Sequence, residues 1–265
     1  MKLLSNKTQM ILLILLSGYG YITSCAHKDE TVPQAASTGP IITRGTNIFL
    51  PGSMATGNSN EWKVDKPHGN VTWSTAYMGS GAALTGRFNQ YGVHDVTDAE
   101  MLNYVTTGQP LKDDSWAFYE NEPAKTFING YVQINQSNTG EPARDGGCNI
   151  TTLGTTPIVT GTQNLTVTNI ARIKSTKIEF DPLSNDYIVT LNLTWQGKLA
   201  APLTKSIVGR LKYVPKSTIQ IGTAAPYNVF GLQLQFQFNC RDFGIVSTSI
   251  ADKIDIEVNI NFNNK

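Results

Sequence analysis

Strict alternation of apolar and polar residues near the C-terminus constrains the fold of this chain more than any other feature. In residues 230–240 and again in residues 254–262, every second residue is Phe, Leu, Ile, Val or Cys, and the residues between are mostly Gln, Asn, Asp or Glu. Successive side chains of a β-strand point to opposite faces of its sheet, so this period of two predicts two half-buried strands.

Weaker versions of the same pattern recur along the chain. They lie in residues 71–77, 84–88, 128–134, 177–180, 187–195 and 203–213. About eight strands joined by turn-rich segments are typical of an antiparallel barrel or sandwich. A helix is expected only at residues 97–105, where Thr97 and Glu100 have capping-box spacing, and around residues 148–154. We therefore expect an all-β fold, an eight-stranded antiparallel barrel with a short helix or helical turns in inserted loops.

A barrel of this size is just wide enough to be filled by its own side chains or to hold one small ligand. The alternation cannot distinguish these two states. Taken alone it favours a packed core, because protein interiors are generally close-packed.

The N-terminus has the features of a bacterial lipoprotein signal. Lys2 and Lys7 precede an apolar run at residues 10–16. Residues 22–24 resemble a relaxed lipobox in front of Cys25. The apolar run is too short for a spanning helix. We expect residues 1–24 to be a signal peptide and Cys25 to carry the lipid anchor, with an ordinary signal peptide and a chance cysteine as the alternative.

The residues after the cysteine indicate a tether and an envelope location. Residues 25–58 contain few groups to bury, which predicts a lipid-anchored tether in front of a barrel domain at 59–265. The residue directly after the cysteine is Ala26 and not the aspartate that retains many lipoproteins at the inner membrane, so we expect an outer membrane lipoprotein. The charged cluster at 28–30 resembles a surface-export signal and equally a solvated charge run, so periplasmic and surface-facing positions both stay open.

Composition argues against several classes of function. The formal net charge is +1 with no basic block, so nucleic acid is not an expected partner. His27, His68 and His94 lie in unrelated segments, and no metal or cofactor is expected. The letters Asp-Phe-Gly at 242–244 occur in protein kinases, but the glycine-rich phosphate loop and the catalytic loop of a kinase are missing, and we expect no enzyme.

Five short segments in a fixed order carry a family resemblance over most of residues 61–263. The matching residues are Asp65, His68, Trp73, Gly86 and Phe88; Arg144 and Asp145; Tyr187, Val189, Thr190, Leu193, Thr194, Gly197 and Pro202; Asn239, Asp242, Phe243 and Gly244; and the last strand. In this order they resemble the YceI-like family. The chain departs from the family pattern at Tyr77 and Gly147, where a histidine is common, and at Cys240, where an arginine is common.

The resemblance implies a secreted, lipocalin-like antiparallel barrel that holds a long apolar molecule, such as a polyisoprenoid or fatty-acid derivative, for carriage or storage. The implied partners are therefore an apolar small molecule with a polyprenyl or acyl chain and, through the lipidated N-terminus, a membrane. The candidate wall residues are Trp73, Phe88, Leu191, Leu193, Leu232, Leu234, Phe236, Phe238, Ile256 and Val258. Plain core packing is the alternative for each of them.

Two pairs of residues are candidates for links at the barrel end. Cys148 and Cys240 can form a disulfide in an exported protein, with two free thiols as the alternative. If the strand alternation continues to Asp242, its carboxylate points inward and needs a partner, for which Arg144 is our hypothesis. Gly244 is placed where a bend at the strand end is tolerated.

A second function uses the same barrel as a packed scaffold for an envelope interaction module. Its contact surface would be the insertion at 90–125, with Tyr91, Tyr104, Trp116, Phe118 and Tyr119. The sequence leaves open whether the protein forms a homodimer.

Overall fold

The structure, a computed structural model, describes residues 41–44, 62–101, 112–119, 122–145, 153 and 166–265. All the described residues belong to one compact unit, Pro40–Lys265. Cys25, Tyr104, Gly147 and Cys148, together with the predicted signal peptide, lie outside the described residues.

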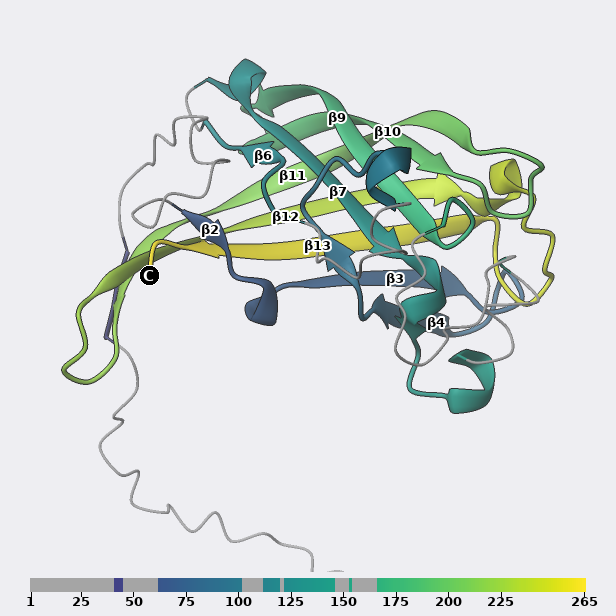
Figure 1. Cartoon of the computed structure of the whole chain (residues 1–265), viewed down its shortest axis with the longest axis horizontal. Helices are drawn as coiled ribbons and strands as arrows, with labels where there is room; N and C mark the ends of the chain where they lie inside the picture. The colour runs from purple at the N-terminus through teal and green to yellow at the C-terminus, as the bar shows by residue number, and fades with distance from the viewer. Residues whose placement is uncertain (1–40, 45–61, 102–111, 120–121, 146–152, 154–165) are drawn as a thin grey trace, which may run out of the picture. The chain divides into compact units, whose positions relative to one another are not determined.

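Antiparallel strands make up most of the described structure (Figure 1). The longer strands are β3 (Asn70–Ala76), β4 (Ala83–Phe88), β7 (Phe127–Gln133), β9 (Ile170–Asp181), β10 (Asp186–Trp195), β11 (Leu203–Gln220), β12 (Tyr227–Asn239) and β13 (Lys253–Asn263). The short strands are β1 (Ile41–Arg44), β2 (Lys63–Val64), β5 (Tyr91–Gly92), β6 (Trp116–Ala117) and β8 (Ser137–Asn138). The main sheet follows the order β5-β7-β9-β10-β11-β12-β13-β3-β4-β8.

The strongest sequence pattern forms the centre of this sheet. β13 pairs with β12 over its whole length, with Phe236 opposite Ile256 on the inner face. On the outer face the Gln237 amide donates a 2.7 Å hydrogen bond to the Asp255 carboxylate. Apolar contacts inside and amide-carboxylate bonds outside are what alternating strands provide, so these two predicted strands are confirmed.

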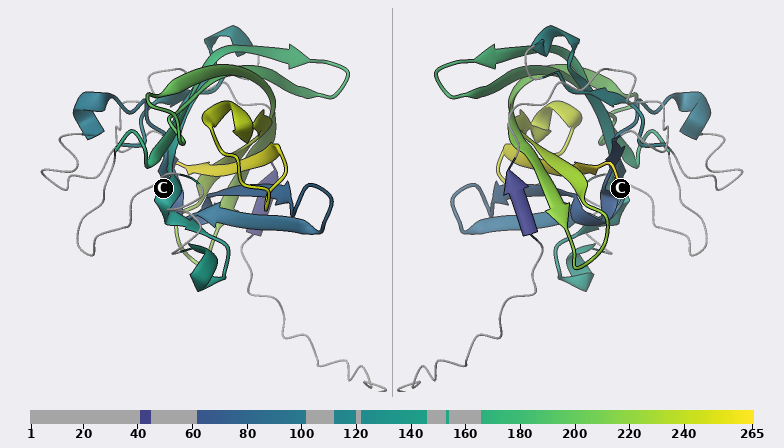
Figure 2. Two further views of the ribbon diagram at one scale, coloured as in Figure 1. Left: turned by 90° about the vertical axis from the view of Figure 1, so that its right-hand side faces the viewer. Right: turned by 90° about the vertical axis from the view of Figure 1, so that its left-hand side faces the viewer.

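The sheet is strongly curled and barrel-like, as the two end views in Figure 2 show. β4 pairs with β8 and β5 pairs with β7. Between these pairings, the amide of Asn89 donates to the carbonyl of Gln136 at 3.0 Å, and the amide of Gln133 donates to the carbonyl of Gln90 at 2.9 Å. Every strand pairing among the described residues is antiparallel, which confirms the predicted antiparallel β architecture.

Helical structure in the described residues is limited to short segments. Four of these are the 3-10 turns η3 (Lys66–His68), η4 (Pro123–Lys125), η5 (Ile134–Gln136) and η7 (Cys240–Phe243). The predicted capping box is present, because the amide of Thr97 donates to Glu100 Oε2 at 2.8 Å and the amide of Glu100 donates to Thr97 Oγ1 at 3.2 Å. The rest of that predicted helix and most of residues 148–154 lie outside the described residues.

Part of the predicted tether belongs to the sheet. Ile41–Arg44 forms β1 and pairs with residues 217–220 of β11. The strand was not predicted, because a run of four residues, Ile-Ile-Thr-Arg, is too short to show a period of two.

One end of the interior is filled by aromatic rings, and we call it the aromatic end. It consists of Trp62, Trp116, Phe118, Tyr187, Tyr213, Phe230 and Phe262. The ring of Phe262 stacks on Phe230 with centroids 4.5 Å apart, and Trp116 lies 4.3 Å from Phe262. Such pairs add to the stability gained from area burial alone.

The aromatic end corrects the prediction of a contact surface in the 90–125 insertion. Trp116 is 1% exposed, Phe118 is 0% exposed and Tyr91 is 7% exposed. Tyr119 is half-buried. The insertion turns inward because large apolar rings are stabilised by burial, and the open end of a curled sheet offers a place for them. Trp116, Phe118 and Tyr91 are therefore core residues rather than contact residues, and Tyr104 lies outside the described residues.

Candidate ligand cavity

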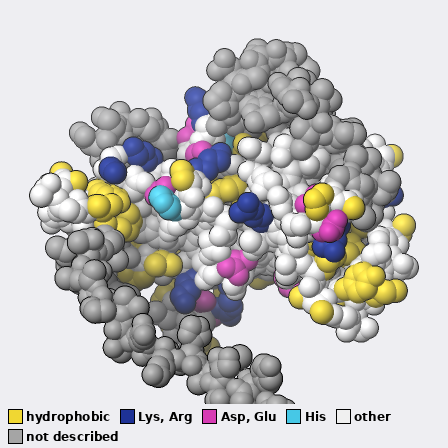
Figure 3. Space-filling view, turned by 90° about the horizontal axis from the view of Figure 1, so that it is seen from below, with side chains coloured by type: hydrophobic (Ala, Val, Ile, Leu, Met, Phe, Trp, Pro, Cys, Tyr) yellow, Lys and Arg dark blue, Asp and Glu magenta, His cyan; other side chains and the backbone are white. Residues whose placement is uncertain are grey.

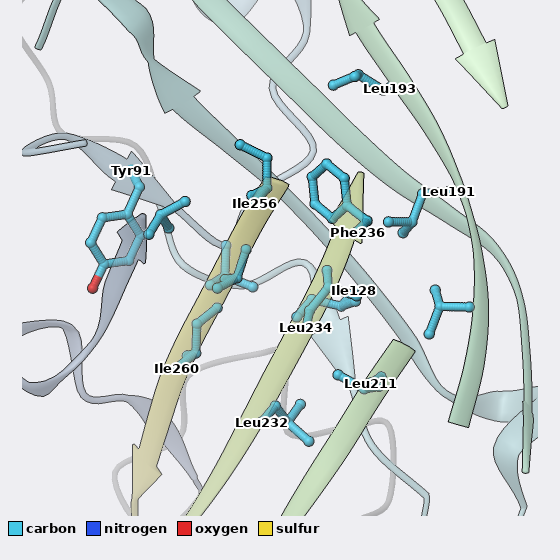
Figure 4. Close-up of a cluster of buried hydrophobic side chains, with 14 of the residues drawn as sticks. Tyr91, Ile128, Leu191, Leu193, Leu211, Leu232, Leu234, Phe236, Ile256 and Ile260 are labelled. Carbon is cyan, nitrogen blue, oxygen red and sulfur yellow. The ribbon is translucent and has the colours of Figure 1, made fainter. Parts of the chain in front are cut away.

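The other end of the interior contains a cavity of about 420 Å³. We call this part the cavity end. Apolar side chains from β3, β7, β12 and β13 line most of it, and Figure 4 shows Leu234, Phe236, Ile256 and Ile260 turned toward the same interior. This volume falls in the range of small-molecule sites, which are mostly apolar with a few polar groups.

Most of the predicted wall residues line this cavity. They are Trp73, Phe88, Leu193, Leu234, Phe236, Phe238, Ile256 and Val258. Leu191 and Leu232, which we also expected in the wall, are buried in the core away from the cavity lining. Alternation places a side chain inside the sheet, but it cannot say whether that side chain meets a void or another side chain.

The cavity opens at the end where the β3–β4 turn meets the β12–β13 connection. Tyr77 forms an isolated bridge with Ile250, and the amide of Met78 donates to the carbonyl of Ser249 at 3.0 Å. Tyr77, Ser249 and Ile250 also line the cavity, and the Tyr77 side chain is half exposed. These residues form a mouth that joins the apolar interior to solvent.

Arg241 fixes the loop beside this mouth, which we call the mouth loop (residues 245–252). Its guanidinium donates to the carbonyls of Ile245, Ser247 and Ile250 at 2.6 to 2.9 Å, and its Nε donates to Asp252 at 2.8 Å. Arg241 was not among the predicted site residues. An arginine directly after a strand and before a polar loop was the available signal, but many surface arginines share it.

The segment at 239–246 also corrects two of our predictions. β12 ends at Asn239 and the 3-10 turn η7 begins at Cys240, so the alternation does not extend to Asp242. Asp242 is exposed, and its Oδ2 lies 3.2 Å from Nζ of Lys205 rather than pairing with Arg144. Gly244 ends η7 with a φ of 73°, a left-handed conformation in which glycine is favoured, which confirms the predicted bend.

Cys240 is buried at the wall of the cavity. Its Sγ is 3.5 Å from the carbonyl oxygen of Ala251, and burial raises the pKa of the thiol above its usual value. A raised pKa disfavours the reactive thiolate. Because Cys148 lies outside the described residues, the disulfide stays a prediction.

The Trp73 ring lies where it does because Gly86 opposes it across the β3–β4 pair. A Cβ at Gly86 would come within 2.6 Å of the Trp73 ring. The Trp73 indole donates a 2.9 Å hydrogen bond from Nε1 to Ser137 Oγ, and both residues line the cavity. The tryptophan and glycine of the family pattern therefore act together to form one wall.

Arg144 is the only charged side chain among the described residues that line the cavity. It is half-buried, and no hydrogen bond or ion pair to it is found in the described part of the chain. The neighbouring Asp145 accepts bonds from the amide and the hydroxyl of Thr139 at 2.9 and 2.8 Å, so its carboxylate is engaged elsewhere. The guanidinium therefore stands at the cavity without a partner among the described residues.

A polar cluster in the insertion lies outside the cavity. His94 contacts Asp114 through Nδ1 at 2.6 Å and Glu100 through Nε2 at 2.8 Å. Burial alone lowers the pKa of His94, but the two carboxylates outweigh it and the pKa is raised above 6.5. Hydrogen bonds from Thr97 and His94 likewise lower the pKa of Glu100 against the effect of burial. A doubly paired imidazolium fits a structural ion cluster.

The described residues show no group of His, Cys, Asp or Glu side chains arranged to hold a metal ion. In the same residues, no helix is long and apolar enough to cross a membrane. On the face seen from below in Figure 3, basic and acidic side chains are interspersed rather than separated by sign.

Comparison with known proteins assigns the family. The profile of the YceI-like domain matches residues 62–262, so the chain belongs to the YceI-like domain family. This confirms the resemblance found in the sequence. A comparison with curated proteins finds no match.

Several solved structures have a similar arrangement. BcnA of Burkholderia cenocepacia is 14% identical, with 75% of this chain and 99% of that chain covered and a TM-score of 0.45. A Campylobacter jejuni YceI protein is 16% identical, with coverage of 69% and 86% and a TM-score of 0.46. A polyisoprenoid binding domain from Saccharophagus degradans is 9% identical, with coverage of 76% and 97% and a TM-score of 0.40.

Proposed function

We propose that this protein binds one apolar small molecule, with a polyprenyl or acyl chain, inside its curled sheet and carries or stores it in the cell envelope. The observation that carries the proposal is the cavity of about 420 Å³ with a mostly hydrocarbon wall. Membership of the YceI-like family supports the same function.

Burial of hydrocarbon provides enough free energy for such binding. Each methylene removed from water contributes about 0.8 kcal/mol, so a chain of about ten methylenes contributes roughly 8 kcal/mol before the cost of association. No catalytic step and no metal are part of the proposal, since the wall holds few polar groups.

We infer that the sheet closes into an eight-stranded lipocalin-like barrel. The inference is supported by the hydrogen bonds of Asn89 with Gln136 and of Gln90 with Gln133, which continue the pairing between the β4–β5 and β7–β8 segments. If β4–β5 and β7–β8 each count as one strand, the main path returns to its start. Closure would shield the cavity wall from water on all sides except the mouth.

The proposal is tested with residues 26–265, which include the whole compact unit Pro40–Lys265. Native mass spectrometry of the purified protein, followed by organic extraction, should find one apolar molecule per chain. Protein that is reproducibly empty and that takes up no apolar molecule after loading would contradict the proposal. Val258→Phe, which projects a larger ring into the cavity, is the matched control and should purify empty.

We also propose that Cys25 anchors the protein to the outer membrane through a lipid, with residues 1–24 as the signal peptide and much of residues 25–58 as the tether. Stable attachment needs more than one acyl chain. In membrane fractionation, the wild-type protein should sediment with the outer membrane and Cys25→Ser should not. A Cys25→Ser variant that still sediments with the membrane would sink this proposal.

A further inference from the structure

The cavity is closed at the aromatic end. Phe230 and Phe262 are stacked across its base, Trp116 packs on Phe262, and Trp62 packs edge-on against Phe230 at 4.8 Å. None of these rings lines the cavity, and Phe262 is 0% exposed. The cavity lining ends at Leu234 on β12 and Ile260 on β13, and the rings fill the interior beyond these residues. A chain that enters at the mouth therefore cannot pass through the interior to the other end.

The size of the cavity sets the length of chain that it can enclose. One water occupies about 30 Å³ of liquid, and a methylene group is of similar size, so a cavity of about 420 Å³ holds on the order of ten to fourteen carbon-sized groups. A longer chain would have to leave its remaining carbons outside the mouth, in water, where they gain nothing from burial.

Charge at the cavity indicates the head group. Arg144 is the only charged lining residue among those the structure describes, and the other polar members, such as Ser249, Thr139 and Tyr77, are neutral. Thr139 directly follows β8 and donates a hydrogen bond to Asp145. Tyr77 and Ser249 belong to the mouth. A guanidinium that has no partner in the described part of the chain matches an oxyanion such as a carboxylate or phosphate, which it can bind through two parallel hydrogen bonds.

We propose that the cavity is a blind pocket for a single-chain amphiphile with an oxyanion head and a chain of about ten to fourteen carbons. The head binds Arg144 in the cavity wall, and the chain end stops where the cavity ends, before the aromatic end. This rests on the proposed function and adds the ligand's length and charge to it.

The test uses residues 26–265, stripped of lipid, and isothermal titration with saturated fatty acids from eight to eighteen carbons. Matched primary alcohols and alkyl phosphates form the second and third series. Affinity for the acids should rise about fourfold per added methylene while the chain is enclosed, and stop rising at about ten to fourteen carbons. Alcohols should bind about tenfold more weakly than acids of the same length.

Arg144→Gln should remove the difference between acids and alcohols and leave the affinity for alcohols unchanged. Lys205→Gln is the matched control, because Lys205 pairs with Asp242 and does not line the cavity; it should change neither series. If both the acids and the phosphates lose affinity in Arg144→Gln, Arg144 recognises either oxyanion. If only one of the two series loses affinity, the ligand carries the head group of that series.

Three results are distinguishable from these. Affinity that keeps rising to eighteen carbons would overturn the blind pocket. Equal binding of acids and alcohols with a length limit would overturn the head group and keep the proposed function. Failure of every acid, alcohol and phosphate to bind would contradict the proposed function itself.

Discussion

The two ends of the sheet's interior are built from the same strands and differ in the size of the side chains that meet there. At the aromatic end, inward positions of β12 and β13 hold Phe230 and Phe262, and β6 adds Trp116 from the insertion. At the cavity end, the same strands present Leu234 and Ile256, and a void of about 420 Å³ remains. Alternation decides which side chains face inward, and their volumes decide whether the interior is full.

The largest expected effect is a difference in the free energy of unfolding between two substitutions in β12, one at each end of the interior. Phe230→Ala should lower the free energy of unfolding by about 3–5 kcal/mol, because it leaves a hole among packed rings. Phe236→Ala should cost about 2 kcal/mol, because that ring already borders the cavity and loses fewer contacts. Urea unfolding of the lipid-free protein measures both values. Equal costs would show that the two ends are packed alike.

Enlarging a side chain should likewise be tolerated better at the cavity than in the packed core. Leu211→Phe, at a residue that is 0% exposed and does not line the cavity, should cost about 1–3 kcal/mol from overpacking. Val258→Phe should cost less than about 1 kcal/mol, because the ring enters existing space, and it should abolish uptake of an apolar ligand. Thermal unfolding and ligand titration check the pair. A Val258→Phe protein that is as destabilised as Leu211→Phe would argue against a void.

Replacing Arg241 should destabilise the mouth loop and leave the packing of the interior unchanged. Arg241→Ala removes the bonds to Ile245, Ser247, Ile250 and Asp252 and should cost about 1–2 kcal/mol. Hydrogen exchange should speed up in the mouth loop and stay unchanged at the aromatic end. Lys205→Ala, which breaks only the exposed pair with Asp242, is the control and should leave the mouth loop protected. Uniform loss of protection would mean that Arg241 supports the whole fold.

The smallest expected effect is a pH dependence from His94. Its folded-state pKa is raised above 6.5, so its stabilising contribution is complete below pH 6.5 and is lost as pH rises through the folded-state pKa. The pKa of Glu100 is lowered, so its contribution is present above its usual pKa of 4.5 and is lost as pH falls through the lowered value. The unfolding midpoint of the wild type, relative to His94→Gln, should therefore be highest between pH 4.5 and 6.5.

A difference that increases above pH 6.5 would show that His94 is stabilising in its neutral form. The comparison with His94→Gln is needed because other carboxylates also titrate as the pH falls. A difference that stays constant from pH 5 to 8 would mean that the ion cluster contributes nothing measurable.

Particular residues show what the sequence can and cannot predict. The strands at 230–239 and 254–262 were predicted because one face of each is buried and the other is wet, which leaves a period of two. Leu191 and Leu232 were wrongly assigned to the cavity wall because the location of a void depends on which side chains meet across the sheet. Asp242 was wrongly placed inward because the strand ends three residues earlier, and alternation holds only within a strand.

The insertion shows the same limit at larger scale. Trp116 and Phe118 lie in a segment rich in polar residues and proline, which reads as a surface loop. Their burial depends on the open end of a curled sheet built from residues far away in the chain. The closed end of the cavity, and with it the length limit on a ligand, was therefore not predictable from local sequence patterns.

One end of the interior is hollow and apolar, while the other is filled by side chains. Apolar cavities that are empty of ligand take up xenon. A crystal structure of the lipid-free protein under xenon pressure should show xenon among Leu234, Phe236 and Ile256, and none between Trp116 and Phe262. Xenon at the aromatic end, or its absence from the cavity end in ligand-free protein, would contradict the claim.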